Sequence, residues 1–185
     1  MNRRQALFGL SMTGLALGGC MRRPEVRPDF RLAGPYVLAT GDRLRIIVFG
    51  QDSLSNIYQI DASGRIAMPL VGVVQVGGLS TAGAANAIAA KLRGGFIREP
   101  KVTVEVDTYR PFFILGEVTN SGQFPFVNGA TIQTAVAIAG GFTPRAERNY
   151  AELTRRTPRG IVVGDVPITY PIRPGDTIVI KERWF

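Results

Sequence analysis

The sequence predicts an α+β protein made of two small domains, each with one helix packed on a mixed sheet. A chain of 185 residues is long enough for one or two domains. Its 22 glycines and 12 prolines indicate many turns and short strands. Two segments, 80–93 and 131–139, carry apolar residues at helical spacing, and a Gly-Gly pair follows each. Each predicted domain therefore receives one helix.

The first domain is expected at residues 36–108, after an N-terminal region discussed below. Ser80 is a good N-cap for its helix, and Gly94-Gly95 ends that helix. Asp61 to Gly64 is a turn that would join its neighbouring strands as a hairpin. The apolar helix face is predicted to be Ala85, Ile88, Ala89 and Leu92. The predicted strands are Arg43 to Phe49, Asn56 to Ile60, Gly64 to Pro69, Val71 to Val76 and Lys101 to Asp107.

The second domain is expected at residues 109–185 and ends in a strand. Its helix starts at Thr131 or Gly129 and ends at Gly140-Gly141. One helix on a mixed sheet in so short a segment suggests an α+β roll of ubiquitin-like type. The apolar helix face is predicted to be Ile132, Ala135, Val136 and Ala139. The predicted strands are Phe112 to Val118, Gly122 to Val127, Ala151 to Arg156, Ile161 to Val163 and Thr177 to Lys181.

Two long stretches without charge, Ile66 to Ala90 and Val118 to Pro144, have the length of membrane spans. Their glycine, proline and asparagine residues instead predict a strand, a turn and a short helix in each.

A short Gly-Asp repeat also occurs in the sequence, because Gly41-Asp42 and Gly175-Asp176 each lead into a strand. Taken alone, this repeat is explained by common turn chemistry, in which Gly allows the turn and Asp caps it.

The first 19 residues predict a secretory signal peptide. Arg3 and Arg4 precede an uncharged, mostly apolar run from Ala6 to Gly19, which is short for a bilayer span. The ending Leu17-Gly18-Gly19-Cys20 resembles a lipobox, which implies cleavage between Gly19 and Cys20 and a lipid on Cys20. A plain signal peptide with a chance cysteine is the alternative, and the arginine pair also resembles a twin-arginine signal.

Residues 20–35 are predicted to be a lipidated N-terminal tether, because Pro24, Pro28 and Pro35 favour an extended chain. Met21 follows the cysteine, and by resemblance to sorted lipoproteins this implies the periplasmic face of the outer membrane.

The net charge is +8, but no zinc-finger spacing or RNA-binding motif accompanies it, so nucleic acid is not an expected partner.

No catalytic, metal or cofactor site is expected. The chain has no histidine, which removes the commonest general base and metal ligand. Glu105, Asp107 and Asp165 look like surface strand or turn residues, and Asp42, Asp61 and Asp176 look like turn caps. The glycine pairs do not form a phosphate-binding pattern. The sequence is therefore not expected to be an enzyme.

Several segments together resemble the bacterial polysaccharide export family, the Wza-like outer-membrane export lipoproteins. Pro174 to Ile180 looks like the closing strand of an SLBB domain, a β-grasp module. The other matching segments are Tyr36 to Phe49, Ile60 to Gly72, Gly77 to Thr81, Pro100 to Val106, Phe113 to Phe124 and Thr131 to Phe142.

The resemblance implies a polysaccharide export domain followed by an SLBB domain. It implies transport of an exopolysaccharide or capsular polysaccharide by a homo-oligomeric ring, docked on an inner-membrane polysaccharide co-polymerase. Larger members add a final amphipathic helix that builds the outer-membrane pore. This sequence ends at Phe185, shortly after a strand, so it resembles a short class.

The alternative function is a carbohydrate-binding or sensing lipoprotein without a channel role. Aromatic rings could stack on sugars, and arginines could pair with uronic or pyruvyl groups. Trp184 is the expected exposed sugar contact. Core or subunit packing is the expected role of Phe112, Phe124 and Phe126, which lie in predicted strands.

The Cys20→Ser variant is expected to be released into the soluble periplasmic fraction. Each buried acyl methylene contributes about 0.8 kcal/mol to membrane binding, and several chains together anchor a protein stably. Cell fractionation beside the unchanged chain measures the effect. If the variant stayed in the outer-membrane fraction, another anchor or a tightly bound partner would be required.

Overall fold

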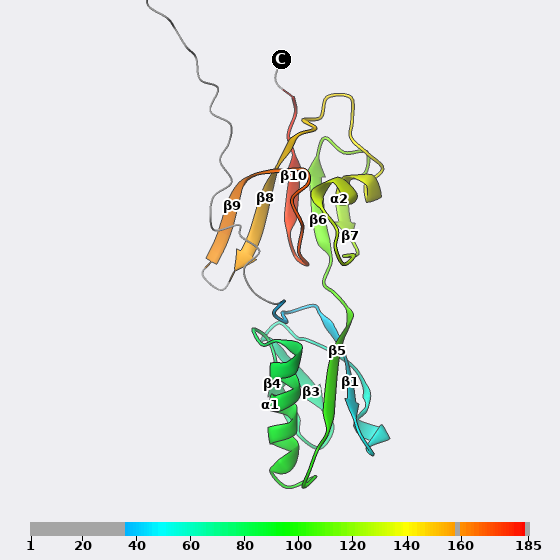
Figure 1. Ribbon diagram of the computed structural model, residues 1–185, viewed down its shortest axis with the longest axis vertical. Helices are drawn as coiled ribbons and strands as arrows, with labels where there is room; N and C mark the ends of the chain where they lie inside the picture. The colour runs from blue at the N-terminus through cyan, green and yellow to red at the C-terminus, as the bar shows by residue number, and fades with distance from the viewer. Residues whose placement is uncertain (1–35, 158–159, 184–185) are drawn as a thin grey trace, which may run out of the picture.

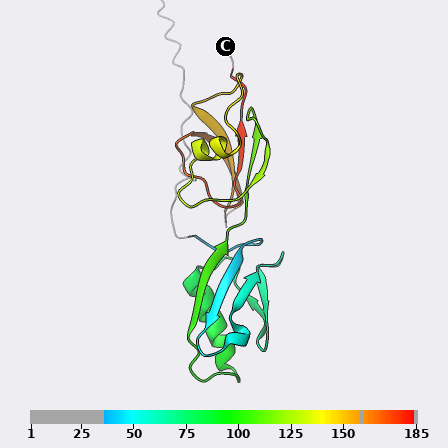
Figure 2. The same cartoon turned by 90° about the vertical axis from the view of Figure 1, so that its right-hand side faces the viewer.

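The computed structural model describes residues 36–157 and 160–183, which form two units stacked along the long axis of the molecule (Figure 1). The first unit ends with strand β5 (Val102–Thr108), and the second begins with β6 (Phe112–Gly116). The view from the side shows the two units joined by a narrow connection (Figure 2). The short segment between β5 and β6 is therefore placed to control how the units sit together.

The first unit is built on β1 (Arg43–Val48), the central strand of an antiparallel sheet with the order β2-β1-β5. Burial alternates along β1, and Leu44, Ile46 and Val48 point into the core. This alternation is typical of a strand with one face covered. The remaining elements are β2 (Asn56–Gln59), β3 (Arg65–Met68), β4 (Gly72–Gln75), helix α1 (Thr81–Arg93) and one turn of 3-10 helix (Asp52–Leu54).

The predicted helix and its ends are confirmed in α1. The Ser80 hydroxyl accepts a hydrogen bond from the Gly83 N–H at 3.1 Å, as an N-cap does, and Gly94 is the C-cap. The buried face is Ala84, Ile88, Ala89 and Leu92. Ala84 thus takes the place predicted for Ala85, because it lies one turn before Ile88 and therefore faces the sheet.

The hairpin predicted between β2 and β3 is wrong. The Asp61 turn does form, since the Asp61 carboxylate accepts the N–H groups of Ser63 and Arg65 at 2.8 and 2.9 Å. However, β2 pairs with β1, whereas β3 pairs with β4 in a separate two-stranded sheet. Turning into this second sheet lets β3 bury Ile66 and Met68 against the helix-bearing core.

The second unit holds a five-stranded mixed sheet with the order β7-β6-β10-β8-β9. β6 and β10 are parallel neighbours, and the other pairs are antiparallel. The predicted strands are all present, and the β9 strand is longer than the predicted Ile161 to Val163. The bounds of the four remaining strands are β7 (Gly122–Phe124), β8 (Tyr150–Thr157), β9 (Gly160–Pro167) and β10 (Thr177–Ile180).

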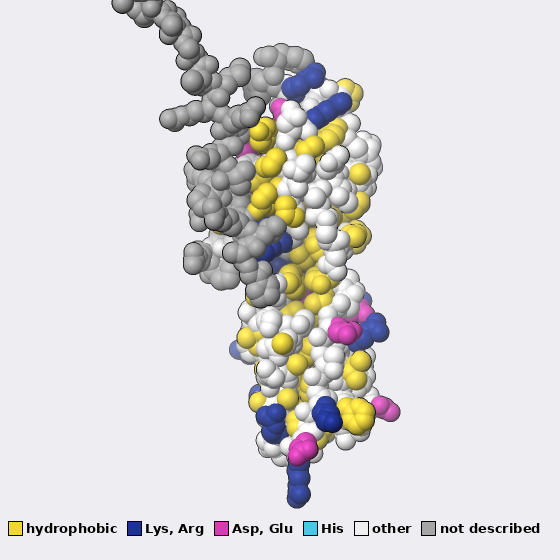
Figure 3. Space-filling model, viewed as in Figure 1, with side chains coloured by type: hydrophobic (Ala, Val, Ile, Leu, Met, Phe, Trp, Pro, Cys, Tyr) yellow, Lys and Arg dark blue, Asp and Glu magenta, His cyan; other side chains and the backbone are white. Residues whose placement is uncertain are grey.

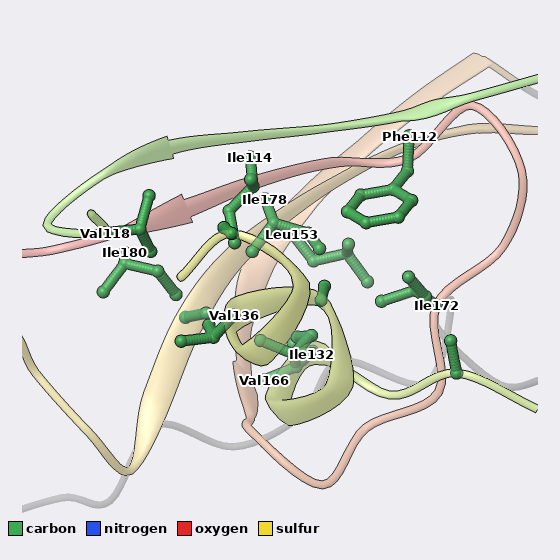
Figure 4. Packing of buried hydrophobic residues seen from close by; sticks show 14 of the residues in the cluster. Phe112, Ile114, Val118, Ile132, Val136, Leu153, Val166, Ile172, Ile178 and Ile180 are labelled. Carbon is green, nitrogen blue, oxygen red and sulfur yellow. The ribbon is translucent and has the colours of Figure 1, made fainter. Parts of the chain in front are cut away.

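Helix α2 (Ile132–Ile138) covers one face of this sheet. Thr131 is its N-cap, and the predicted face of Ile132, Ala135, Val136 and Ala139 is buried as expected. Figure 4 shows Ile132 and Val136 opposite strand residues that include Ile114, Leu153 and Ile178. One helix on a mixed sheet is thus confirmed for this unit, and its finer classification as a β-grasp stays a prediction.

Neither of the long uncharged stretches is a single helix. Residues 66–90 run through β3, β4 and most of α1, and residues 118–144 contain β7 and α2. Within the part of the chain that the structure describes, every helix is too short or too polar to cross a bilayer. The strand, turn and helix predicted in each stretch are therefore confirmed.

Replacing Ile88 by Ala should destabilise the first unit by about 2–5 kcal/mol, because it leaves a cavity under α1. Ile88 is fully buried, and its core cluster shares no residue with the cluster of the second unit. Hydrogen exchange should therefore speed up in α1 and β5 more than in β6 and β10. The matched control is Ile57→Ala, at a side chain that is 37% exposed. Equal loss of protection in both units would show that the two cores unfold together.

Candidate functional site

The segment Tyr109 to Pro111 connects the two units, and Arg110 lies at its centre. Its side chain contacts the first unit through Asp42 and Tyr36, and it lies against Gly175 of the second unit. Residues from three separate parts of the chain therefore meet at this junction.

The carboxylate of Asp42 is fully buried at the junction. One oxygen accepts hydrogen bonds from the Tyr36 hydroxyl at 2.5 Å and the Ala39 N–H at 2.9 Å. The other oxygen accepts a hydrogen bond from the backbone N–H of Arg110 at 3.0 Å. The Arg110 guanidinium lies 3.2 Å from the first oxygen. A buried charge is tolerated when it is paired and hydrogen-bonded in this way.

Tyr36 links this ion pair to a row of aromatic rings. Its hydroxyl accepts a hydrogen bond from Arg110 at 2.8 Å, and the guanidinium lies 5.6 Å from the ring centre. Burial, and then the hydrogen bond to Asp42, raise the pKa of Tyr36 well above its ordinary value of 10.0. The edge-to-face contacts from Tyr36 to Tyr109 and from Tyr109 to Phe126 measure 5.1 and 5.5 Å between centroids. The row of aromatic rings therefore runs from the first unit into the second.

The second unit holds a matching buried ion pair, formed by Asp176 and Arg155. Arg155 donates to both carboxylate oxygens, at 3.0 and 2.7 Å, and it is only 5% exposed. Burial alone would lower the pKa of Arg155, but the hydrogen bonds and charge of Asp176 outweigh it and raise that pKa. Arg155 also donates to the Pro171 carbonyl at 3.2 Å and lies over the Tyr170 ring. Arg155 is thus held in one position.

Asp42 and Asp176 occupy turns of the same geometry. In each, the Asp N–H donates to the carbonyl three residues earlier, Ala39 or Arg173, at 3.1 Å. Each carboxylate also accepts the N–H of that earlier residue. The preceding glycines have φ values of +92° and +82°, which favour glycine. The Gly-Asp repeat in the sequence therefore corresponds to a repeated turn in the structure.

Both turns lie against Arg110. A Cβ added to Gly41 would lie 3.5 Å from the Arg110 Cβ, and one added to Gly175 would lie 2.6 Å from the Arg110 Nε. Sequence reasoning explained the two turns separately and did not bring them together. The available signal was the repeated Gly-Asp pair, combined with an arginine at the boundary between the predicted domains.

A cavity of about 610 Å³ opens between the units beside these turns. Four of its lining side chains are arginines, and Figure 3 shows Lys or Arg side chains at the level of the junction. This volume is typical of small-ligand sites. The lining residues are the segment 36–40, Ala62, Gly78, Arg110, the segment 155–157 and the segment 173–176.

The residues predicted as sites fall in different places. Gly19, Cys20 and Trp184 lie outside the described residues. Phe112 is fully buried in the core of the second unit, and Phe124 and Phe126 pack against that core, as expected. Over residues 36–157 and 160–183, no cluster of acidic or sulfur side chains is suited to hold a metal.

Comparison with protein families gives a match for each unit. The polysaccharide biosynthesis/export family matches residues 31–107, and the SLBB domain family matches residues 111–171. The chain therefore carries a polysaccharide export domain followed by an SLBB domain. The boundary between the two matches falls at residues 108–110, so Arg110 lies where the export domain meets the SLBB domain.

Curated relatives are similar to parts of this chain. The exopolysaccharide production protein ExoF of Rhizobium meliloti is 30% identical over 59% of this chain and 29% of its own length. The EPS I polysaccharide export outer membrane protein EpsA of Ralstonia nicotianae is 26% identical over 86% of this chain and 50% of its own length. The polysialic acid transport protein KpsD of Escherichia coli is 25% identical over 59% of this chain and 20% of its own length. The chain thus spans half or less of these relatives.

Replacing Gly175 by Ala should weaken the junction between the two domains. The new Cβ would displace the Arg110 guanidinium from Asp42, which should cost about 1.5–3 kcal/mol beyond the backbone strain. Gly129→Ala is the matched control, because Gly129 has a similar φ of +77° and open space around it. Urea unfolding measures both free energies.

The Arg110→Ala background provides the decisive comparison for this prediction. Without the guanidinium, Gly175→Ala and Gly129→Ala should cost about the same, because only backbone strain remains. If the extra cost of Gly175→Ala persisted in that background, the contact with Arg110 would not be its cause.

Proposed function

We propose that this chain is a non-enzymatic component of polysaccharide export, acting on an exopolysaccharide or capsular polysaccharide. The observation that carries the proposal is the tandem of an export domain and an SLBB domain over residues 31–107 and 111–171. The buried carboxylates of Asp42 and Asp176 are bound to arginines and backbone N–H groups. Such groups suit structural roles better than acid–base catalysis.

The proposed location is the periplasmic face of the outer membrane, with a lipid on Cys20 as the anchor. Support comes from the lipobox-like ending before Cys20 and from Met21 after it. One relative, EpsA, is named as an outer membrane export protein. Residues 20–35 then act as the tether between the lipid and the export domain.

In this proposal several copies assemble into a ring that conducts the polymer and docks on an inner-membrane polysaccharide co-polymerase. The SLBB sheet offers a surface for subunit contact, because α2 covers only one of its faces. On the other face, Phe113, Leu115 and Val163 are 40, 45 and 46% exposed, and nearby Ile161 is 63% exposed. Phe113 and Val163 lie in one cross-strand row, through Thr177 and Thr154. Exposed apolar surface of this kind favours protein contact.

A second candidate function is a carbohydrate-binding or sensing lipoprotein without a channel role. The cavity at the domain junction favours it, because the cavity has the size of a small-ligand site and is lined by arginines. The two functions make different demands on the chain. Conduction requires an assembly, whereas binding at the junction requires one copy.

Replacing Leu115 by Lys should reduce assembly and polymer secretion, because burying an unpaired ammonium in a subunit contact is unfavourable. The isolated subunit should tolerate the change, since the Leu115 side chain is already 45% exposed and a lysine there can stay hydrated. Chemical cross-linking on intact cells, with secreted polymer measured in parallel, checks this. Val127→Lys is the control, at a 53% exposed apolar residue outside the sheet.

The unchanged chain should give cross-linked species larger than a monomer. A purely monomeric result together with normal polymer secretion would contradict the proposed ring. Normal assembly of the Leu115→Lys variant would instead show that subunits meet through another surface.

A further inference from the structure

The cavity between the two domains carries an excess of positive charge. Of its four arginines, Arg110 is paired with Asp42 and Arg155 with Asp176. Arg156 and Arg173 make no ion pair with any residue that the structure describes. Two guanidinium groups at the cavity are thus available to an anion.

The two unpaired arginines approach the cavity from adjoining elements of the SLBB domain. Arg156 lies near the end of β8, and Arg173 begins the turn that contains Asp176. The backbone N–H of Arg173 is bound to the Asp176 carboxylate at 2.7 Å, which fixes the start of that side chain. Arg155, immediately before Arg156, is anchored by the same carboxylate. The arginines therefore project from a rigid base.

The opposite wall belongs to the export domain and is mostly uncharged. It is formed by residues 36–40, with Ala62 and Gly78 beside them, and it includes the Tyr36 ring and the partly exposed Val37 side chain. A sugar ring has apolar C–H faces and polar edges. A cavity with an apolar wall opposite cationic groups matches a sugar that also carries a negative charge.

We propose that this cavity binds a carboxylate-bearing sugar, such as a hexuronate, with Arg156 and Arg173 pairing with the carboxylate. Guanidinium groups pair with carboxylates through two parallel hydrogen bonds, which gives direction as well as affinity. The proposal rests on the proposed export function only for the source of the sugar, as a unit of the exported polymer. Binding itself needs one copy of the chain and no assembly.

The test titrates the purified full chain, extracted from membranes in neutral detergent, with glucuronate, glucose and inorganic phosphate. Isothermal calorimetry should show saturable glucuronate binding that weakens as salt concentration rises. Glucose lacks the carboxylate, and phosphate lacks the sugar ring. Each should therefore bind at least about tenfold more weakly than glucuronate.

Arg156→Gln and Arg173→Gln should each weaken glucuronate binding about tenfold, and the double variant should abolish it. Both side chains lie outside the two buried ion pairs, so the melting temperature should stay unchanged. The matched control is Arg148→Gln, which removes an exposed arginine of the same domain that does not line the cavity. This control should bind glucuronate as the unchanged chain does.

Equal binding of glucose and glucuronate, absence of glucuronate binding, or full binding by the double variant would each overturn the proposed site. Phosphate binding as strong as that of glucuronate would show a general anion site and overturn the sugar specificity. The export proposal is judged separately by cross-linking and secretion. A chain that assembles and secretes polymer but does not bind glucuronate therefore refutes only this site.

Discussion

The buried carboxylate of Asp42 is the constraint on which the arrangement of the two domains depends. It is fully buried, and its partners come from the start of the export domain and from the segment between the domains. Leaving such a charge without its partner is strongly destabilising. Arg110 must therefore stay beside Asp42, and because β6 begins two residues later, the SLBB domain starts from a fixed point.

The second turn completes the junction from the other side. Gly175 donates its N–H to the Pro111 carbonyl at 3.0 Å, and Asp176 accepts the Phe113 N–H on its own carbonyl at 2.9 Å. Glycine at 175 leaves room for the Arg110 guanidinium. The same turn also positions Arg155 and Arg173 at the cavity. Domain placement and the chemistry of the cavity thus depend on one short stretch of chain.

Local patterns predicted most of the elements but not how distant ones meet. The caps at Ser80 and Thr131 and the apolar helix faces could be read from spacing, because helix periodicity is a local property. The β2–β3 hairpin was wrong because the Asp61 turn is local, whereas the choice of strand partner depends on the core. The junction was missed for the same reason. Arg110 is 68 residues from Asp42, and no spacing rule links them.

The parallel pairing of β6 and β10 has a mechanical consequence. The chain enters the SLBB domain at the start of β6, next to Arg110, and leaves its sheet at the end of β10. Tension applied between these two points pulls the neighbouring strands lengthwise in opposite directions. The backbone hydrogen bonds along this paired segment, which is in register from Phe113 opposite Thr177 to Gly116 opposite Ile180, are then loaded together in shear and not opened one after another. The domain is thus built to resist force along the direction in which the chain passes through it.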